Sequence, residues 1–143
     1  MTCRRRKNAQ AYDSSGYEIK SLTAWSESRL MWPLVRFDAC NVLEEGDSIW
    51  NSGKFAPASI RLKFTGGMQR VTRVELQAEM SPLRAVVHHE IRAADVVVCV
   101  KGPVAHGAWI HVDLNCDTQL IEIVTIASPS FVAWKRIRVF GCC

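Results

Sequence analysis

Residues 109–140 constrain the fold more than any other part of the chain, because apolar and polar side chains alternate along much of this stretch. Ile110 and Val112 alternate with His111 and Asp113, for example. The same alternation recurs at residues 120–126 and 136–140. A period of two is typical of half-buried strands in an antiparallel sheet. The end of the chain is therefore predicted to form antiparallel strands with one face in a core.

Alternating segments separated by turn residues cover most of the remaining chain. Strands are expected at residues 59–64, 70–80, 85–92 and 95–101. Gly66–Gly67 is a tight-turn signal, which predicts that the first two of these strands pair as a hairpin. With no helical period longer than a turn or two, eight or so short strands predict an all-β antiparallel sandwich. The residues expected in its core are Val74, Leu76, Ile91, Ile110, Val112, Ile121, Ile123, Ile137 and Val139.

Composition favours a single globular domain without a membrane span. The chain has 143 residues, 48% of them apolar and 22% charged, and no apolar run approaches the ~20 residues of a membrane helix. Four of the 18 basic residues cluster at residues 4–7, so the remaining 14 balance the 14 acidic residues. Residues 1–20 are predicted to be a polar, basic, flexible tail and residues 21–143 the sandwich. Nucleic acid is not an expected partner, because the basic charge does not form a face of the domain.

The six cysteines and four histidines show no spacing typical of a metal site. His88 and His89 are adjacent, so on a strand they point to opposite faces and cannot bind one ion together. Cys99 lies in a run of valines and is expected to pack as a small hydrophobe. His89 shares a face with Val87 and Ile91, and it is expected to lie in the core with a hydrogen-bond partner. No metal or cofactor is predicted.

Two segments resemble a known family. Residues 128–134, Ser-Pro-Ser-Phe-Val-Ala-Trp, connect two alternating strands, the second of which ends in Phe-Gly. Residues 48–53, Ser-Ile-Trp-Asn-Ser-Gly, precede a proline and a further alternating strand. These motifs resemble the galactose-binding-domain-like family, which includes discoidin domains, the C-terminal domains of coagulation factors five and eight, and many bacterial carbohydrate-binding modules. The resemblance covers about residues 22–141 and implies an eight-stranded jelly-roll β-sandwich, usually without catalytic activity.

The resemblance also implies a structural calcium site, which many family members form from an Asp in an Asp-Gly loop and an acidic residue in the final strand. This chain departs from the pattern at both places. Its loop at residues 41–48 has no Asp-Gly pair, and Arg136 stands in the final strand. A guanidinium repels a cation, so Arg136 is expected to pair instead with Glu44, Glu45 or Asp47.

The chain shows no catalytic signature, and we predict that it is not an enzyme. The resemblance implies a binding module, with a galactose-type glycan as its ligand; the alternative is a module for protein–protein interaction or assembly. The arginines near the N-terminus are not followed by an apolar segment, so no secretory signal is evident. We therefore expect a cytoplasmic protein or one domain of a larger assembly, and self-association is left open.

Sugars stack their C–H faces on aromatic rings and take hydrogen bonds from polar side chains, so a sugar site needs both kinds of residue. Among the five tryptophans, Trp50, Trp109 and Trp134 lie beside predicted strands and are expected to seal the ends of the sandwich. Two strands leave through Ser-Pro turns, at residues 81–82 and 128–129, which should meet near the loop at residues 25–32. The predicted ligand groove is therefore formed by Trp25, Arg29, Trp32, Arg84, Ser130 and Phe131.

Overall fold

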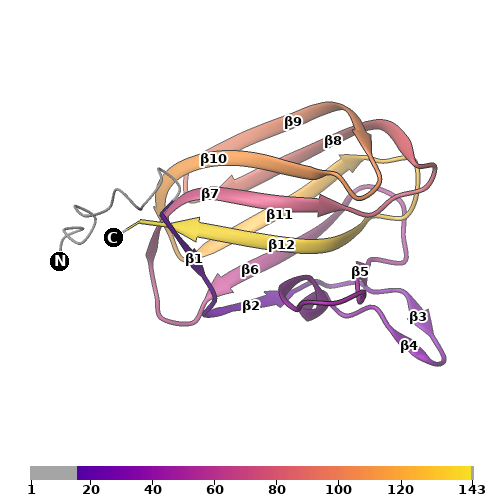
Figure 1. Cartoon of the computed structure of the whole chain (residues 1–143), viewed down its shortest axis with the longest axis horizontal. Helices are drawn as coiled ribbons and strands as arrows, with labels where there is room; N and C mark the ends of the chain where they lie inside the picture. Colours follow the sequence, from indigo (N-terminus) through magenta and orange to yellow (C-terminus); the bar gives the residue numbers. More distant parts are fainter. Residues whose placement is uncertain (1–15, 143) are drawn as a thin grey trace.

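The computed structural model describes residues 16–142, which form two five-stranded antiparallel sheets packed as a sandwich and a separate two-stranded hairpin (Figure 1). The basic cluster at residues 4–7 lies outside the described residues. The strands are β1 (Tyr17–Ile19), β2 (Leu22–Trp25), β3 (Met31–Trp32), β4 (Val35–Arg36), β5 (Trp50–Asn51), β6 (Ala58–Phe64), β7 (Gln69–Ala78), β8 (Arg84–Ala93), β9 (Val96–Ala105), β10 (Trp109–Thr118), β11 (Leu120–Ala127) and β12 (Ala133–Gly141). One 3₁₀ helix, η2 (Ala39–Leu43), follows β4. The all-β sandwich predicted from the alternation is confirmed.

The first sheet has the order β1-β12-β7-β10, and β5 also pairs with β12. β5 pairs with the beginning of β12, where Trp50 lies opposite Trp134, and β1 pairs with its end, where Tyr17 lies opposite Gly141. These two short strands bring the two sheets to ten strands together, two more than the family pattern implied.

Strand β1 lies in the segment that the sequence assigned to the N-terminal tail. Ile19 is buried, with 5% of its surface exposed, and it packs directly against Gly141. A Cβ atom at Gly141 would lie 2.6 Å from Ile19 Cδ1 and 2.7 Å from the carbonyl oxygen of Arg70. Any larger residue at this position would therefore push β1 away from the sheet.

The second sheet has the order β2-β6-β11-β8-β9. The predicted hairpin between residues 59–64 and 70–80 is wrong, because β6 lies in the second sheet and β7 in the first. The turn at Gly66–Gly67 instead carries the chain from one sheet to the other. This crossing lets the apolar faces of β6 and β7 meet across the core. β6 buries every second side chain, and β7 contributes Val71, Val74, Leu76 and Ala78.

The core between the sheets contains eight of the nine predicted residues as buried side chains, and the ninth, Ile110, is half-buried against it. Burying one such aliphatic side chain contributes about 1.5–3 kcal/mol relative to leaving it in water. Trp50 and Trp134 are buried as predicted, whereas Trp109 is 37% exposed. Trp109 is the first residue of β10 and lies on the face of this strand whose side chains are exposed, with His111 and Asp113.

A network of charged side chains covers the outer face of the first sheet. Glu75 is only 6% exposed, and its carboxylate lies 3.0 Å from Arg73 Nη2 and 3.1 Å from His111 Nδ1. Arg138 Nη1 approaches the same carboxylate at 3.9 Å, and both arginines lie over the ring of Phe140. The buried Glu75 carboxylate is thus surrounded by basic side chains from its own strand, β7, and from both neighbouring strands, β10 and β12.

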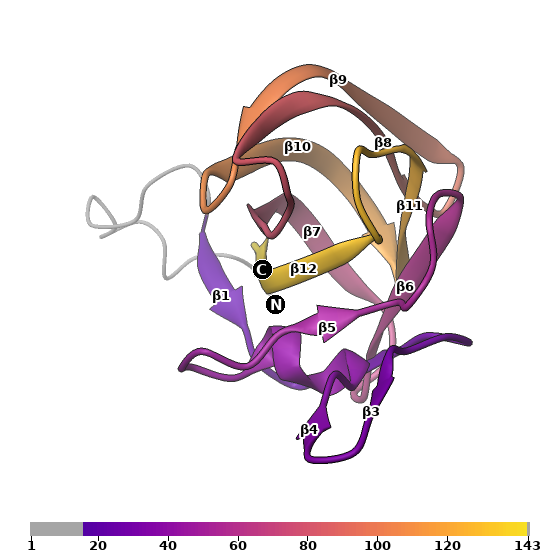
Figure 2. The ribbon, with the colours of Figure 1, turned by 90° about the vertical axis from the view of Figure 1, so that its right-hand side faces the viewer.

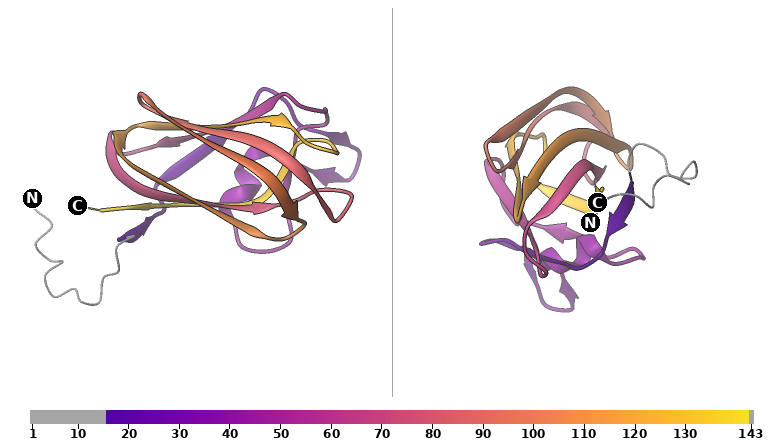
Figure 3. Two further views of the ribbon diagram at one scale, coloured as in Figure 1. Left: turned by 90° about the horizontal axis from the view of Figure 1, so that it is seen from above. Right: turned by 90° about the vertical axis from the view of Figure 1, so that its left-hand side faces the viewer.

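The connections at the two ends of the sandwich differ in length. Four of them lie at one end, at residues 26–57, 79–83, 106–108 and 128–132, and Figure 2 looks onto this end. At the opposite end the strands are joined by short turns, and β1 lies there beside the last residues of β12 (Figure 3). Within residues 16–142 no helix has the length and apolar character needed to cross a membrane. Binding residues are commonly carried by loops, so the longer connections favour a site at the first end.

Candidate functional site

Hydrogen bonds tie the loops at this end to one another. The backbone N–H of Ser81 donates to Ser130 Oγ at 3.2 Å, so the two Ser-Pro turns meet as the sequence predicted. Loop 52–57 joins the same cluster, because Ser52 N donates to the carbonyl oxygen of Val132 at 2.8 Å and Val132 N donates to that of Lys54 at 3.0 Å. The walls of any hollow between these loops are therefore fixed by main-chain contacts, which favours a preformed site.

A groove of about 420 Å³ lies between the two Ser-Pro turns and loop 52–57. Its lining residues are Asn51, Phe55, Glu79, Met80, Ser81, Pro129, Ser130, Phe131 and Ala133. This volume falls within the range of small-molecule pockets. The rings of Phe55 and Phe131 meet edge to face, with centroids 4.9 Å apart and planes at 75°. Phe55 is 60% exposed, so an aromatic surface faces solvent on one side of the groove.

The polar side of the groove consists of Glu79, Ser81 and Ser130, with His106 behind Glu79. The backbone N–H of Met80 donates to His106 Nδ1 at 3.1 Å. Because Nδ1 acts as an acceptor, the neutral ring carries its proton on Nε2, which lies 4.0 Å from the Glu79 carboxylate. The His106 ring can therefore donate a hydrogen bond from Nε2. The Glu79 carboxylate beside it can accept hydrogen bonds from the hydroxyl groups of a ligand.

His89 lies beneath this groove, in the core. It is 4% exposed, and its Nδ1 lies 2.9 Å from Thr125 Oγ1, as the predicted core histidine with a hydrogen-bond partner should. Its ring packs against Trp134 with centroids 4.7 Å apart. Burial, with a smaller contribution from the neighbouring His88, lowers the pKa of His89 from 6.5 to about 4. The folded protein therefore holds the His89 ring in its neutral form at neutral pH.

A second hollow of about 420 Å³ has a different lining. It runs between loop 26–28 and the outer face of the second sheet, and it has no aromatic residue on its walls. Arg92 and Glu122, which form part of it, already pair with one another at 3.7 Å. The groove with the two phenylalanines therefore suits a ligand that needs both stacking and hydrogen bonds.

Comparison with solved structures identifies the architecture. A family 32 carbohydrate-binding module from Clostridium perfringens, solved with galactose, aligns over 87% of this chain and 98% of its own, with a TM-score of 0.69 and 17% identity. A second module from the same organism, solved with GalNAc-β-1,3-galactose, aligns over 87% and 99% with a TM-score of 0.71 and 13% identity. A fucose-binding module of Streptococcus pneumoniae aligns over 91% and 99%, with a TM-score of 0.65 and 14% identity. The chain has the galactose-binding-domain-like fold. No protein-family model and no curated protein matches it by sequence.

Within this galactose-binding-domain-like fold, the six residues predicted to form one groove are distributed over several places. Ser130 and Phe131 line the groove described above. Arg29 and Trp32 line a separate hollow of about 200 Å³ beside the β3–β4 hairpin. Trp25 lies on the second sheet with the guanidinium of Arg61 5.1 Å from its ring centroid, and Arg84 is exposed at the start of β8.

The two hollows are nevertheless adjacent through the main chain. Leu30, which lines the smaller hollow, donates its N–H to the carbonyl oxygen of Asn51, which lines the larger groove, at 2.6 Å. Sequence reasoning missed Asn51, Phe55, Glu79, Ser81 and His106. Phe55 was accessible to that reasoning, as an aromatic between Gly53 and Pro57 in a loop, but its neighbours in space could not be inferred without the pairing of the strands.

The region where the galactose-binding-domain-like family was expected to place calcium holds ion pairs in this chain. Arg136 Nη2 lies 2.7 Å from Glu45 Oε2, one of the three partners predicted for it. Lys135 Nζ approaches Asp47 at 3.9 Å. Nearby, the Arg29 guanidinium, helped by that of Arg36, holds the pKa of Asp38 below its usual range. Cationic side chains thus stand beside these acidic groups, and the donor set does not suit Ca²⁺.

Proposed function

We propose that this protein is a non-catalytic carbohydrate-binding module that takes a galactose-type sugar in the groove between the two Ser-Pro turns. One observation carries the proposal: a solvent-facing aromatic pair, Phe55 and Phe131, stands in the same groove as Glu79, Ser81 and Ser130. A pyranose ring has an apolar C–H face and a rim of hydroxyls, so its recognition needs this combination.

The ligand class is supported by the solved structures that share the fold. Modules of this architecture were solved with galactose and with GalNAc-β-1,3-galactose. In this chain, we assign the stacking surface to Phe55 and Phe131. Glu79 would accept hydrogen bonds from sugar hydroxyls, and the hydroxyl of Ser130 would add a further polar contact.

A longer glycan would reach the smaller hollow as well. Its walls include Arg29 and Trp32, and the backbone bond from Leu30 to Asn51 joins it to the groove. We therefore propose Arg29 and Trp32 as contacts for additional sugar residues. Arg84 would lie at the rim, because it opens β8 directly after the turn that forms one wall. Trp25 is the least favoured of the predicted residues, since its ring is already covered on one side by Arg61.

A protein-interaction module is the second candidate, and the β3–β4 hairpin favours it. Met31, Trp32 and Leu34 are 72%, 63% and 93% exposed. Three large apolar side chains on one short hairpin form a surface that another protein could bury. The glycan array below separates the two functions, because a module that only binds another protein should bind no glycan.

The test is a glycan array followed by titration calorimetry with the best ligand, using the parent protein, Phe55→Ala and Glu79→Gln. Both changes should weaken binding by at least about tenfold, since each removes one of the few directed contacts of the site. Trp25→Ala serves as the matched control, because it removes an exposed aromatic ring outside the groove, and it should bind like the parent. If the parent binds no glycan, the carbohydrate proposal fails and the hairpin function is favoured. Binding untouched by Phe55→Ala and Glu79→Gln would place the sugar elsewhere.

A further inference from the structure

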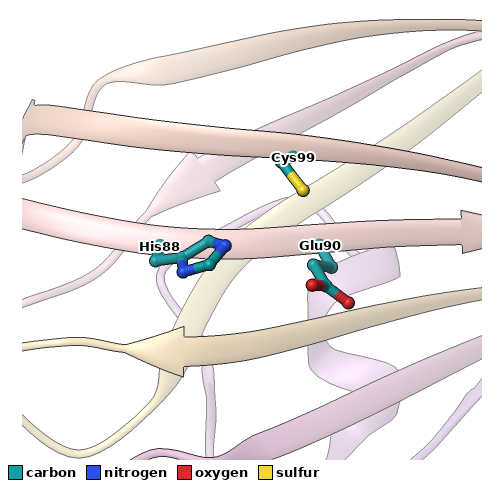
Figure 4. A group of neighbouring side chains, drawn as sticks. All are labelled: His88, Glu90 and Cys99. Carbon is teal, nitrogen blue, oxygen red and sulfur yellow. The ribbon is translucent and has the colours of Figure 1, made fainter.

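The outer face of the β8–β9 hairpin brings together three side chains that can bind metal ions. His88 and Glu90 are two residues apart on β8, so they project from the same face of the strand. Cys99 on β9 lies directly opposite Glu90 in the antiparallel register and projects on that face too. One ligand atom from each of the three residues lies within 4.8 Å of the others. Figure 4 shows the His88 ring extending along β8 toward Cys99 and Glu90.

Imidazole nitrogen, thiolate sulfur and carboxylate oxygen are the three ligand types that Zn²⁺ prefers in proteins. Bond lengths of about 2.0–2.3 Å in a tetrahedral site place ligand atoms roughly 3.3–3.8 Å apart. The three atoms therefore need to approach by about 1 Å, which side-chain rotation can supply without moving the strands. The expectation that Cys99 packs as a small hydrophobe is wrong, because its side chain lies on the exposed face of β9. Solvent can therefore fill the fourth position and the ion can enter.

His88 supplies an independent indication. Among the described residues, its Nε2 is enclosed by neighbouring atoms and has no hydrogen-bond partner. A buried ring nitrogen without a partner costs free energy in the folded state, and coordination to an ion would remove that cost. The imidazole is thus held at the hairpin surface with one nitrogen unused by the rest of the fold.

Arg92 forms an ion pair with the Glu90 carboxylate, and an incoming ion would have to take this carboxylate from it. Glu90 Oε1 accepts hydrogen bonds from Arg92 Nη2 at 2.6 Å and Nε at 3.1 Å. The same guanidinium lies 3.7 Å from Glu122, so it keeps an acidic partner if Glu90 turns toward an ion.

We propose that His88, Glu90 and Cys99 form a three-ligand site for Zn²⁺ or a similar divalent transition metal ion on the outer face of the β8–β9 hairpin. The site is independent of the sugar groove, with which it shares no residue. Binding converts the Cys99 thiol to a thiolate that coordinates the ion, and the proton passes to solvent. No oxidant or reductant takes part.

The test uses the full chain, reduced and freed of metal, with Co²⁺ as a spectroscopic substitute for Zn²⁺. One equivalent of Co²⁺ should give a thiolate-to-metal charge-transfer band, and Zn²⁺ should displace it. Cys99→Ser should abolish the band. His88→Gln and Glu90→Gln should each raise the apparent Kd by at least about tenfold, since each removes a ligand. Zn²⁺ should also raise the Tm of the parent and leave that of Cys99→Ser unchanged.

Two controls remove thiols outside the hairpin. Cys40→Ser takes away another exposed cysteine, and Cys142→Ser with Cys143→Ser takes away the pair at the chain end; all should keep the band. Absence of a band in the parent protein would overturn the proposal. So would a band that survives in Cys99→Ser or disappears with the C-terminal pair. If Cys99→Ser fails to fold, as judged by circular dichroism, an unchanged Kd in His88→Gln overturns the proposal instead.

Discussion

Replacing His89 with glutamine should change how stability depends on pH. His89 is 4% exposed, its Nε2 has no hydrogen-bond partner among the described residues, and Nδ1 is engaged with Thr125. An imidazolium needs two acceptors, and this environment supplies one at most. Burial and, to a lesser extent, His88 therefore lower the pKa of His89 from 6.5 to about 4. A glutamine can keep a bond to Thr125 but does not titrate.

The sign of the effect follows from the direction of the shift. Above pH 6.5 the ring is neutral in both the folded and the unfolded chain, so it adds no pH dependence. As the pH falls from 6.5 toward 4, the unfolded chain takes up a proton that the folded chain does not, and stability is lost. With these two pKa values, the loss between about pH 8 and pH 5 is about 2 kcal/mol.

Urea titrations of both proteins at several pH values between about 5 and 8 measure this directly. His89→Gln should be less stable than the parent at pH 8, because it loses the contact with Trp134, but its free energy of unfolding should fall less steeply on acidification. The difference between the two slopes isolates His89, since every other titrating group is shared. Parallel curves for the two proteins would refute the reasoning, because they would mean that His89 is protonated as easily in the fold as in the unfolded chain.

Three further outcomes follow from the structure. Glu75→Gln should cost about 1–3 kcal/mol in a urea titration, because it removes the buried charge that His111 and two arginines contact; a value near zero would show that solvent already screens the network. Trp50→Phe should lower the free energy of unfolding by about 1–3 kcal/mol, since it leaves a gap in the core and removes the 3.0 Å bond from Nε1 to the carbonyl oxygen of Ser28. Calcium chelation should leave the Tm unchanged, because Arg136 stands beside Glu45; a Tm that falls with chelator and recovers with Ca²⁺ would contradict this.

The fold was largely predictable because a period of two fixes which side chains face the core, whatever the order of the strands. Val74 and Ile123 are buried as that period requires. Pairing is a different matter, because alternation does not say which strand is the neighbour. The turn at Gly66–Gly67 looks like a hairpin turn, yet it connects strands in opposite sheets. Local turn chemistry cannot distinguish the two cases.

The candidate site was less predictable for the same reason. The meeting of the two Ser-Pro turns followed from the strand directions that the family resemblance implies, and Ser81 does contact Ser130. Phe55, by contrast, reaches Phe131 only because β5 pairs with β12. β5 has only two residues, too few for an alternating pattern that would predict a strand. The cluster of His88, Glu90 and Cys99 was not predicted from the sequence, because its residues come from two strands. Rules based on spacing detect ligands on one segment and miss pairs across a register.

The pairing of β1 with β12 determines how this protein can be connected to others. Tyr17 lies opposite Gly141, so the chain enters and leaves the sandwich about 5 Å apart, a single inter-strand spacing. Both points lie at the end opposite the groove (Figure 3). A domain fused to either terminus would therefore leave the loops unobstructed. The two ends are also close enough that the whole sandwich could be inserted into an exposed loop of a host protein without separating the ends of that loop.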